Sequence, residues 1–510
     1  MLVSKVPLKK LFIGNIDGET ESQREDFEQL FYTKNSKFDN IMQPEKFIIS
    51  GRKGTGKTIL AKYIYKKITE KKNHYCKIFT KNDFKLQKLI DMQFRELQEE
   101  ELSIFWKWTF LLQISNVLLD EDTWKKKIPF TPERKLMKFI KNRYPEDIFK
   151  IKDFNKSISS KSSANAGVKS KSKLSPNFSV MKEDNTQTNT NYIHKEYFEL
   201  LPRLERLVLS CLKSKKEVIL IYDDLDELEE RINEHRFYYR VLISMLETIK
   251  QLNLLFKDIQ KSSTKIIVLL RSDIIDQIHQ YSSNSNKLIT ESRVNLYWIV
   301  KNYKSPSDHP LMEMILNKIQ KSVENYSSMD KDTLYKLLFP KKINNKEVID
   351  YLLDYSFGRP RDIIRYLNLI IDNYPEATSF KPKYFKECAQ EYSNWFYNEL
   401  ENEISISENK EMILDGLRLI NDIKKLNFTL QQIEEYFKQN GEHYPKINNL
   451  NETLRHLYKL GVIGNSWVYK RNGEKTTYRY SWGYREDASN DPNFSQWFSV
   501  HYGLKKRFSL

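Results

Sequence analysis

The stretch that decides the fold is Phe47–Thr58, which reads FIISGRKGTGKT. It begins as a short apolar strand, passes through the pattern Gly-x-x-x-x-Gly-Lys-Thr, and continues from Ile59 with apolar residues at helical spacing. A phosphate-binding loop, or P-loop, requires this strand–loop–helix context. The chain has only 14 glycines and three of them fall within six residues here, so a chance glycine turn is the weaker interpretation.

The residue types of this loop suit phosphate chemistry. Glycine lets backbone N–H groups approach phosphate oxygens without a Cβ in the way, and a helix N-terminus favours an anion. We predict that Lys57 contacts the β- and γ-phosphates of ATP and that the Thr58 hydroxyl is a ligand of Mg²⁺. The predicted nucleotide-binding residues of the loop are Gly51, Arg52, Lys53, Gly54, Thr55, Gly56, Lys57 and Thr58.

Length and composition limit the class of protein. A chain of 510 residues predicts about three domains. The 84 Lys and Arg against 68 Asp and Glu give a net charge of +16, which permits nucleic-acid binding without establishing it. The three cysteines are far apart and show no metal-ligand spacing. No apolar run approaches the ~20 residues that span a bilayer, so we expect a cytoplasmic protein with no membrane contact.

A second landmark is an acidic cluster that follows an apolar run. Residues 217–222 read EVILIY and predict a buried parallel strand, which Asp223 and Asp224 follow directly. We expect this strand to lie beside the P-loop strand, with Asp223 as the partner of Mg²⁺ and Asp224 orienting or deprotonating a water molecule. An acidic helix cap is the alternative, and the upstream P-loop makes it the weaker one.

A third apolar run, residues 265–270, is followed by Arg271. We expect this strand end to lie between the two landmarks, where Arg271 would sense the γ-phosphate; Ser272 and Asp273 are alternatives for that role. Arg271 could equally form a structural ion pair with the acids near Asp223. In either role, the charged Arg271 side chain would lie at the edge of the sheet where the strands end.

From about Ser305 the pattern becomes helical and leads to the motif Gly358-Arg359-Pro360-Arg361. Glycine and proline are expected to end one helix and to start the next. In a helical lid, Arg359 or Arg361 would pair with phosphate oxygens. The alternative is a helix cap with solvated arginines.

The last hundred residues have the order of a winged helix. Two helices are predicted at residues 428–437 and 450–460, and two strands follow at 466–471 and 476–482. Such modules bind DNA or dock on proteins, and the sequence leaves both open. The basic residues near the turn between the strands are Lys470, Arg471, Lys475 and Arg479.

These observations predict three domains. The first covers residues 1–300 and is a P-loop ATPase domain with an exposed insertion at about 153–192. A run at residues 293–298 completes its five-stranded parallel sheet, and Arg293 is a weak candidate for an arginine finger acting on a neighbouring subunit. The other two are a helical lid domain at 301–405 and a winged-helix-like domain at 406–510.

The ordered set of motifs resembles the AAA+ ATPases of the origin-recognition type and the related STAND switch ATPases. The glycine-rich loop is also similar to that of a bacterial P-loop ATPase family. The resemblance implies an α/β P-loop NTPase fold with a helical lid and a C-terminal winged helix, and ATP and Mg²⁺ as cofactors. Gly358–Pro360 is similar to the STAND lid motif, and Arg361 stands where related AAA+ proteins keep a second sensor arginine. Asp224 replaces a usual Glu and Arg271 a frequent Asn, which favours slow hydrolysis.

The function expected from this resemblance is a slowly hydrolysing ATP switch. It would change its domain arrangement or oligomerise to control a separate effector protein, in a role such as bacterial anti-phage defence. The alternative is a nucleotide-regulated DNA-binding loader or regulator that uses the winged helix. A small-molecule phosphotransferase is disfavoured because the lid and the C-terminal module are long.

Overall fold

The structure is a computed structural model in which the chain forms two compact units. The predicted insertion at 153–192 lies outside the residues that the structure describes. The described residues are 5–35, 37–80, 99–121, 127–141, 199–213, 216–225, 235–259, 263–281, 285–405, 407, 409–469, 477–489 and 491–510. We call Phe38–Gly51 and Ala61–Asn295 the sheet unit, and Met1–Lys37, Arg52–Leu60 and Leu296–Leu510 the helical unit.

The sheet unit is built on a five-stranded sheet in which every pair of neighbours is parallel, in the order β2-β3-β4-β1-β5. This confirms the predicted parallel five-stranded sheet, which fits an NTPase-like fold. Every residue of β1 and β4 is buried, as expected for strands covered on both faces. The strands are β1 (Ile48–Gly51), β2 (His74–Phe79), β3 (Glu217–Tyr222), β4 (Lys265–Arg271) and β5 (Arg293–Asn295).

The strand order corrects one prediction. β3 does not lie beside the P-loop strand β1, because β4 pairs with both of them. Parallel neighbours are joined by long crossovers, so their order in the sheet does not follow from their order in the chain. Arg271 pairs in register with Gly51, and so does lie at a strand end between the two landmarks, as predicted. β5 is shorter than predicted and ends at Asn295.

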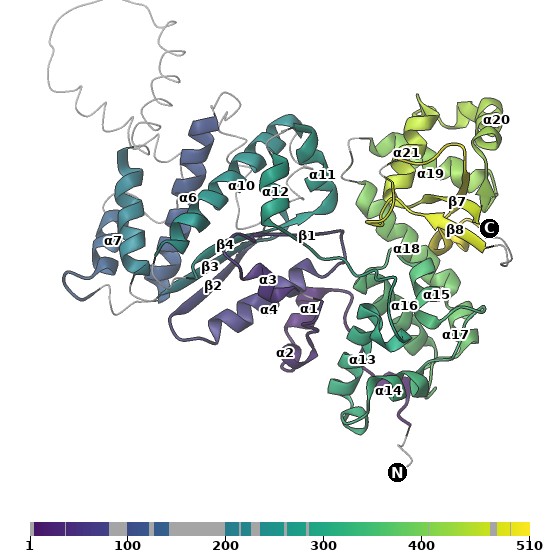
Figure 1. The fold of residues 1–510 in the computed structure, drawn as a ribbon, viewed down its shortest axis with the longest axis horizontal. Helices are drawn as coiled ribbons and strands as arrows, with labels where there is room; N and C mark the ends of the chain where they lie inside the picture. Colours follow the sequence, from purple (N-terminus) through teal and green to yellow (C-terminus); the bar gives the residue numbers. More distant parts are fainter. Residues whose placement is uncertain are drawn as a thin grey trace, which may run out of the picture. The chain divides into compact units, whose positions relative to one another are not determined.

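Helices cover both faces of this sheet. Figure 1 shows α4 (Lys57–Thr69, in the sheet unit from Ala61) on one face and α10 (His235–Lys257) on the other. α6 (Glu99–Glu121) packs against α10, and Trp106 on α6 is fully buried. Further described helices of the unit include α3 (Phe38–Ile41), α7 (Pro132–Lys141), α11 (Ser272–Tyr281), α12 (Ser285–Ser292) and a helix at residues 199–212.

One described helix is long and apolar enough to cross a membrane. It covers the 21 residues Glu100–Asp120 within α6, whereas no apolar run of that length was expected from the sequence. Its most apolar window is 72% buried inside the protein, as in the core helix of a soluble protein. It is therefore weak support for a membrane span.

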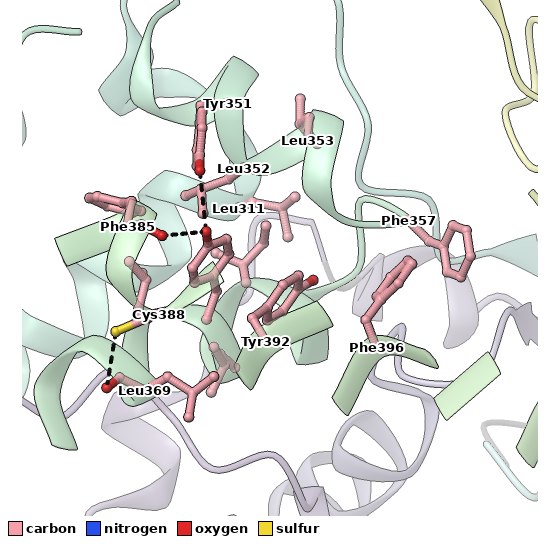
Figure 2. Close-up of a cluster of buried hydrophobic side chains, with 14 of the residues drawn as sticks. Leu311, Tyr351, Leu352, Leu353, Phe357, Leu369, Phe385, Cys388, Tyr392 and Phe396 are labelled. Carbon is pink, nitrogen blue, oxygen red and sulfur yellow. Dashed lines mark hydrogen bonds between the residues drawn. The ribbon is translucent and has the colours of Figure 1, made fainter. Parts of the chain in front are cut away.

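The first part of the helical unit is an all-helical layer around a core rich in aromatic residues. Figure 2 shows Tyr351, Phe385 and Tyr392 in this core, where the hydroxyls of Tyr351 and Tyr366 lie 3.2 Å apart and Tyr366 donates to the Phe385 carbonyl. Buried tyrosines need such partners, so the hydrogen bonds specify how the helices pack. The helices are α13 (Pro310–Ser322), α14 (Lys331–Leu338), α15 (Val348–Tyr355), α16 (Pro360–Asn373), α17 (Pro382–Glu387) and α18 (Ala389–Ile404).

The motif at residues 358–361 ends one helix and starts another, as predicted. α15 ends at Tyr355, Gly358 adopts φ +67°, and Pro360 is the first residue of α16. Proline suits this position because its missing N–H would be unpaired there in any case.

The N-terminal segment belongs to the helical unit. Its short helices α1 (Gly18–Ser22) and α2 (Phe27–Leu30) precede a tyrosine, Tyr32, whose hydroxyl donates to Glu313 on α13. Glu21 is 1% exposed and forms a buried ion pair with Lys318, also on α13. Tyr32 and Glu21 therefore attach the N-terminal segment to α13.

The C-terminal part of the helical unit combines helices with an antiparallel sheet of strand order β6-β9-β7-β8. Both predicted helices exist: a Thr429 capping box starts one, and Gly461 ends the other with φ +84°. Its elements are α19 (Lys410–Asp422), β6 (Asn427–Phe428), α20 (Leu430–Asn440), α21 (Leu450–Leu460), β7 (Ile463–Tyr469), β8 (Thr477–Ser481), β9 (Trp497–Val500) and α22 (Tyr502–Lys505).

The buried pair of Lys318 and Glu21 gives a test of this packing. Replacing Lys318 by Met leaves the Glu21 carboxylate buried without its counter-charge, so we expect Lys318→Met to lower the free energy of unfolding by about 3 kcal/mol. The exposed Lys321 lies on the same helix, and Lys321→Met should change the stability by less than about 0.5 kcal/mol. Urea unfolding followed by circular dichroism measures both; equal effects would contradict the role given to Lys318.

Candidate functional site

The glycine-rich loop has the backbone conformation that its sequence predicts. Gly54 and Gly56 adopt φ +84° and +97°, values that glycine tolerates and other residues rarely adopt. Within the loop, the carbonyl of Arg52 accepts hydrogen bonds from the Thr55 hydroxyl at 2.8 Å and from Lys57 Nζ at 3.2 Å. Lys57 is also the first residue of α4. The loop therefore meets the N-terminus of a helix, which is the arrangement that phosphate binding needs.

The lid motif packs directly on this loop. The Nη1 atom of Arg359 donates to the carbonyl of Lys53 at 3.0 Å, and the backbone N–H of Arg361 points to the carbonyl of Gly54 at 3.4 Å. A Cβ added to Gly54 would lie 3.0 Å from the Cβ of Arg361. Glycine at this position is thus required twice, by its φ and by the close approach of the lid.

Arg359 is buried, with 2% of its surface exposed. Its Nε donates to both carboxylate oxygens of Asp362 at 3.0 Å, and its Nη1 forms an ion pair with Glu403. Burial alone would lower the pKa of Arg359, but the two carboxylates raise it above its usual value. The alternative of a solvated arginine at this position is therefore wrong.

Arg52 joins the loop to four other segments of the helical unit. Its Nη2 donates to Glu403 Oε2 at 2.8 Å, and to the carbonyl of Leu460 at the end of α21 at 3.2 Å. Its guanidinium carbon lies 4.4 Å from the centre of the Phe357 ring and 5.5 Å from that of Tyr484. A residue of the loop is thereby held by the lid and by the C-terminal part together.

Arg361 is the more accessible of the two lid arginines. Its Nη1 donates to Glu399 on α18 at 3.1 Å, and its side chain is 23% exposed. Its Nε is buried without a hydrogen-bond partner, as is Nη1 of Arg52. Both guanidinium groups therefore retain a donor for a further acceptor.

The predicted acids lie at the carboxyl end of β3 in the sheet unit. Asp223 is 4% exposed, its N–H donates to the Phe79 carbonyl, and its Oδ1 accepts from the N–H of Asp224 at 2.9 Å. Asp224 has φ +58°, a conformation that Asp and Asn tolerate better than most residues. The chain therefore turns sharply at these two acids.

Arg271 ends β4 and pairs with Asp273, at 3.0 Å between Nε and Oδ1. A structural ion pair was one of its two predicted roles, although with other acids. Arg293 donates from Nε to the Ser50 hydroxyl on the neighbouring strand β1. Each arginine thus has a partner within the sheet unit.

The predicted residues fall into two groups by unit. The structure brings Arg52–Thr58 together with Arg359, Pro360 and Arg361 in the helical unit, whereas Gly51, Asp223, Asp224 and Arg271 belong to the sheet unit. Sequence reasoning missed Glu403, since nothing in its local sequence relates it to a loop about 350 positions earlier. It also missed Asp362, which its spacing of three residues from Arg359 on a helix would have revealed.

Part of the predicted basic wing lies outside the described residues, namely Lys470, Arg471 and Lys475. Arg479 is described, and its guanidinium stacks 3.7 Å from the centre of the Tyr469 ring. Nucleic-acid binding by this module stays a prediction.

Within the described ranges, no three His, Cys, Asp or Glu side chains form a metal-binding group. Mg²⁺ commonly takes one or two protein ligands, with phosphate oxygens and water completing its shell. Thr58 in the helical unit and Asp223 in the sheet unit stay predicted ligands of Mg²⁺.

One family matches part of the chain. Residues 309–401, which run from the start of α13 into α18, are similar to a family described as the FunZ-associated C-terminal helical domain. The match covers less than a fifth of the chain and includes the lid motif at residues 358–361. A comparison with curated proteins finds no significant match.

A buried histidine next to this site makes stability depend on pH. His501 is fully buried; its Nδ1 accepts from the N–H of Gly503 at 3.1 Å, and its Nε2 lies 3.3 Å from the Tyr484 hydroxyl. Burial lowers the pKa of His501 to about 3, and the nearby arginines act in the same direction. Because its unfolded pKa is about 6.5, the unfolded state gains a proton first as the pH falls.

We therefore expect the free energy of unfolding to fall by about 2 kcal/mol more between pH 7 and pH 5 in the wild type than in His501→Asn. Asn retains a cap for Gly503 but does not titrate. Urea unfolding at the two pH values measures the difference, and groups common to both proteins cancel. Parallel pH profiles would show that His501 is not held neutral.

Proposed function

We propose that the chain is a P-loop ATPase that binds Mg²⁺–ATP through residues 51–58 and acts as a slow molecular switch. The observation that carries the proposal is the loop itself: Gly54 and Gly56 at positive φ, followed by a helix that begins at Lys57. The parallel sheet supports it, because the carboxyl ends of β1, β3 and β4 lie at the same edge of the sheet. Asp223 follows the end of β3, and Arg271 is the last residue of β4.

Individual residues of the loop and of the strand ends would have separate roles in binding and hydrolysis. Loop N–H groups and Lys57 would hold the phosphates, and Thr58 and Asp223 would hold Mg²⁺. Bound Mg²⁺ neutralises charge that develops on the phosphate oxygens. Asp224 would orient the attacking water or take its proton, and Arg271 and Arg361 would respond to the γ-phosphate.

Slow turnover is supported by two features of the site. Asp224 is one methylene shorter than the glutamate of related ATPases, and Arg271 is already paired with Asp273. We propose that the bound nucleotide controls assembly with further copies of the chain or with a separate effector protein, in a role such as anti-phage defence. The resemblance to STAND ATPases supports this last step.

The first test of the proposal concerns binding. Lys57→Ala removes the cation that faces the phosphates, so we expect the affinity for Mg²⁺–ATP in isothermal titration calorimetry to fall by at least about 100-fold. Lys67→Ala, in the last turn of the same helix and paired with the exposed Glu70, should leave the affinity unchanged. If the wild type takes up no Mg²⁺–ATP, the proposed function is wrong.

The second test concerns hydrolysis. Asn accepts the positive φ of Asp224 and keeps its size, so Asp224→Asn should lower kcat by about 100-fold or more while Kd for ATP changes by less than about threefold. Asp258→Asn, at an exposed position of the same unit, serves as the control. Phosphate release under saturating ATP measures kcat. Equal losses of binding and turnover in Asp224→Asn would refute the division of roles between the two aspartates.

A further inference from the structure

One carboxylate is shared by an arginine of the loop and an arginine of the lid. Glu403, in the last turn of α18, is 6% exposed. Its Oε2 accepts from Arg52 at 2.8 Å, and its Oε1 pairs with Arg359. We call Arg52, Glu403 and Arg359 the Glu403 bridge. All three belong to the helical unit.

Charge balance makes this bridge important for the loop. Arg52 and Arg359 carry two positive charges, and the carboxylates of Glu403 and Asp362 that pair with them carry two negative charges. Removing the charge of Glu403 alone would leave an excess positive charge beside the loop. A buried excess charge is unfavourable and is relieved by an anion or by movement of the group toward water.

The bridge also keeps Arg52 on the C-terminal part. While Glu403 holds one side of the guanidinium, Nη2 reaches the Leu460 carbonyl and the plane covers the Phe357 and Tyr484 rings. The Nη1 atom remains buried without a hydrogen-bond partner. Arg52 therefore has a donor to give to an anion, but its position is set by Glu403.

We propose that Glu403 is an internal anion that competes with nucleotide phosphate for Arg52. In the bridged state Arg52 ties the loop to the lid and to the C-terminal part; phosphate binding draws Arg52 away and loosens that tie. This inference rests on the proposed function of the loop and adds its regulation. By linkage, the bridge weakens nucleotide binding by the same factor by which bound nucleotide weakens the bridge, so a variant without the bridge should bind nucleotide more tightly.

The first arm of the test uses the full chain without nucleotide. Glu403→Gln keeps the shape of the side chain and removes its charge. We expect the amide hydrogen exchange rates of the segments Arg52–Thr55 and Leu460–Ile463 to rise by about tenfold or more. This factor corresponds to the free energy of one hydrogen bond to a charged group. Glu399→Gln, which removes the charge paired with Arg361 one turn earlier on α18, should leave Leu460–Ile463 unchanged. Equal exchange in the wild type and Glu403→Gln overturns the proposal.

Saturating Mg²⁺–ATP should increase exchange of Leu460–Ile463 in the wild type. In a separate measurement, calorimetry should find that Glu403→Gln binds Mg²⁺–ATP about tenfold more tightly than the wild type does. Bound ATP that leaves Leu460–Ile463 unchanged, or an affinity lowered by Glu403→Gln, overturns the proposal. If the wild type binds no ATP, the proposed function fails, and the nucleotide-free arm alone decides whether the bridge restrains the loop.

Discussion

The buried Glu403 carboxylate, shared between Arg52 and Arg359, is the interaction on which the arrangement of the helical unit around the loop depends. A guanidinium group buried to the extent of Arg359 must be paired, and Asp362 and Glu403 together meet that need. Once Arg359 is fixed, its remaining donor reaches the Lys53 carbonyl and holds the loop backbone. A charge requirement in the lid thus becomes a positional restraint on residues that are candidates for phosphate binding.

The loop itself meets two constraints with the same glycine. Gly54 needs its positive φ for the turn and its missing Cβ for the approach of Arg361. Phosphate binding asks for the same properties, because N–H groups must converge without side chains between them. The chemistry of the loop and its packing on the lid therefore favour the same residue, and a substitution there would disturb both.

Much of the fold follows from local patterns. The apolar runs before Gly51, Asp223 and Arg271 predict buried parallel strands, and the capping signals at Thr429 and Gly461 predict helix ends that the structure shows. Predictions about which strands are neighbours in the sheet were less successful. The sequence suggests that β3 neighbours β1, but β4 separates them, since a crossover connection does not record which edge it returns to. Arg271 illustrates the same limit: an ion pair was one of its two predicted roles, but with the acids near Asp223 and not with Asp273.

The sequence by itself determined the elements whose causes are local: glycines where the backbone needs positive φ, apolar periodicity that selects strand or helix, and a lysine and a threonine at the start of α4. Only the tertiary structure decided which charges meet. Glu403 lies about 350 positions from Arg52, and nothing nearby in the chain marks it as a partner. Its pairing follows from the packing of α18 and from the cost of burying a charge alone, which are properties of the folded interior and not of any short stretch of sequence.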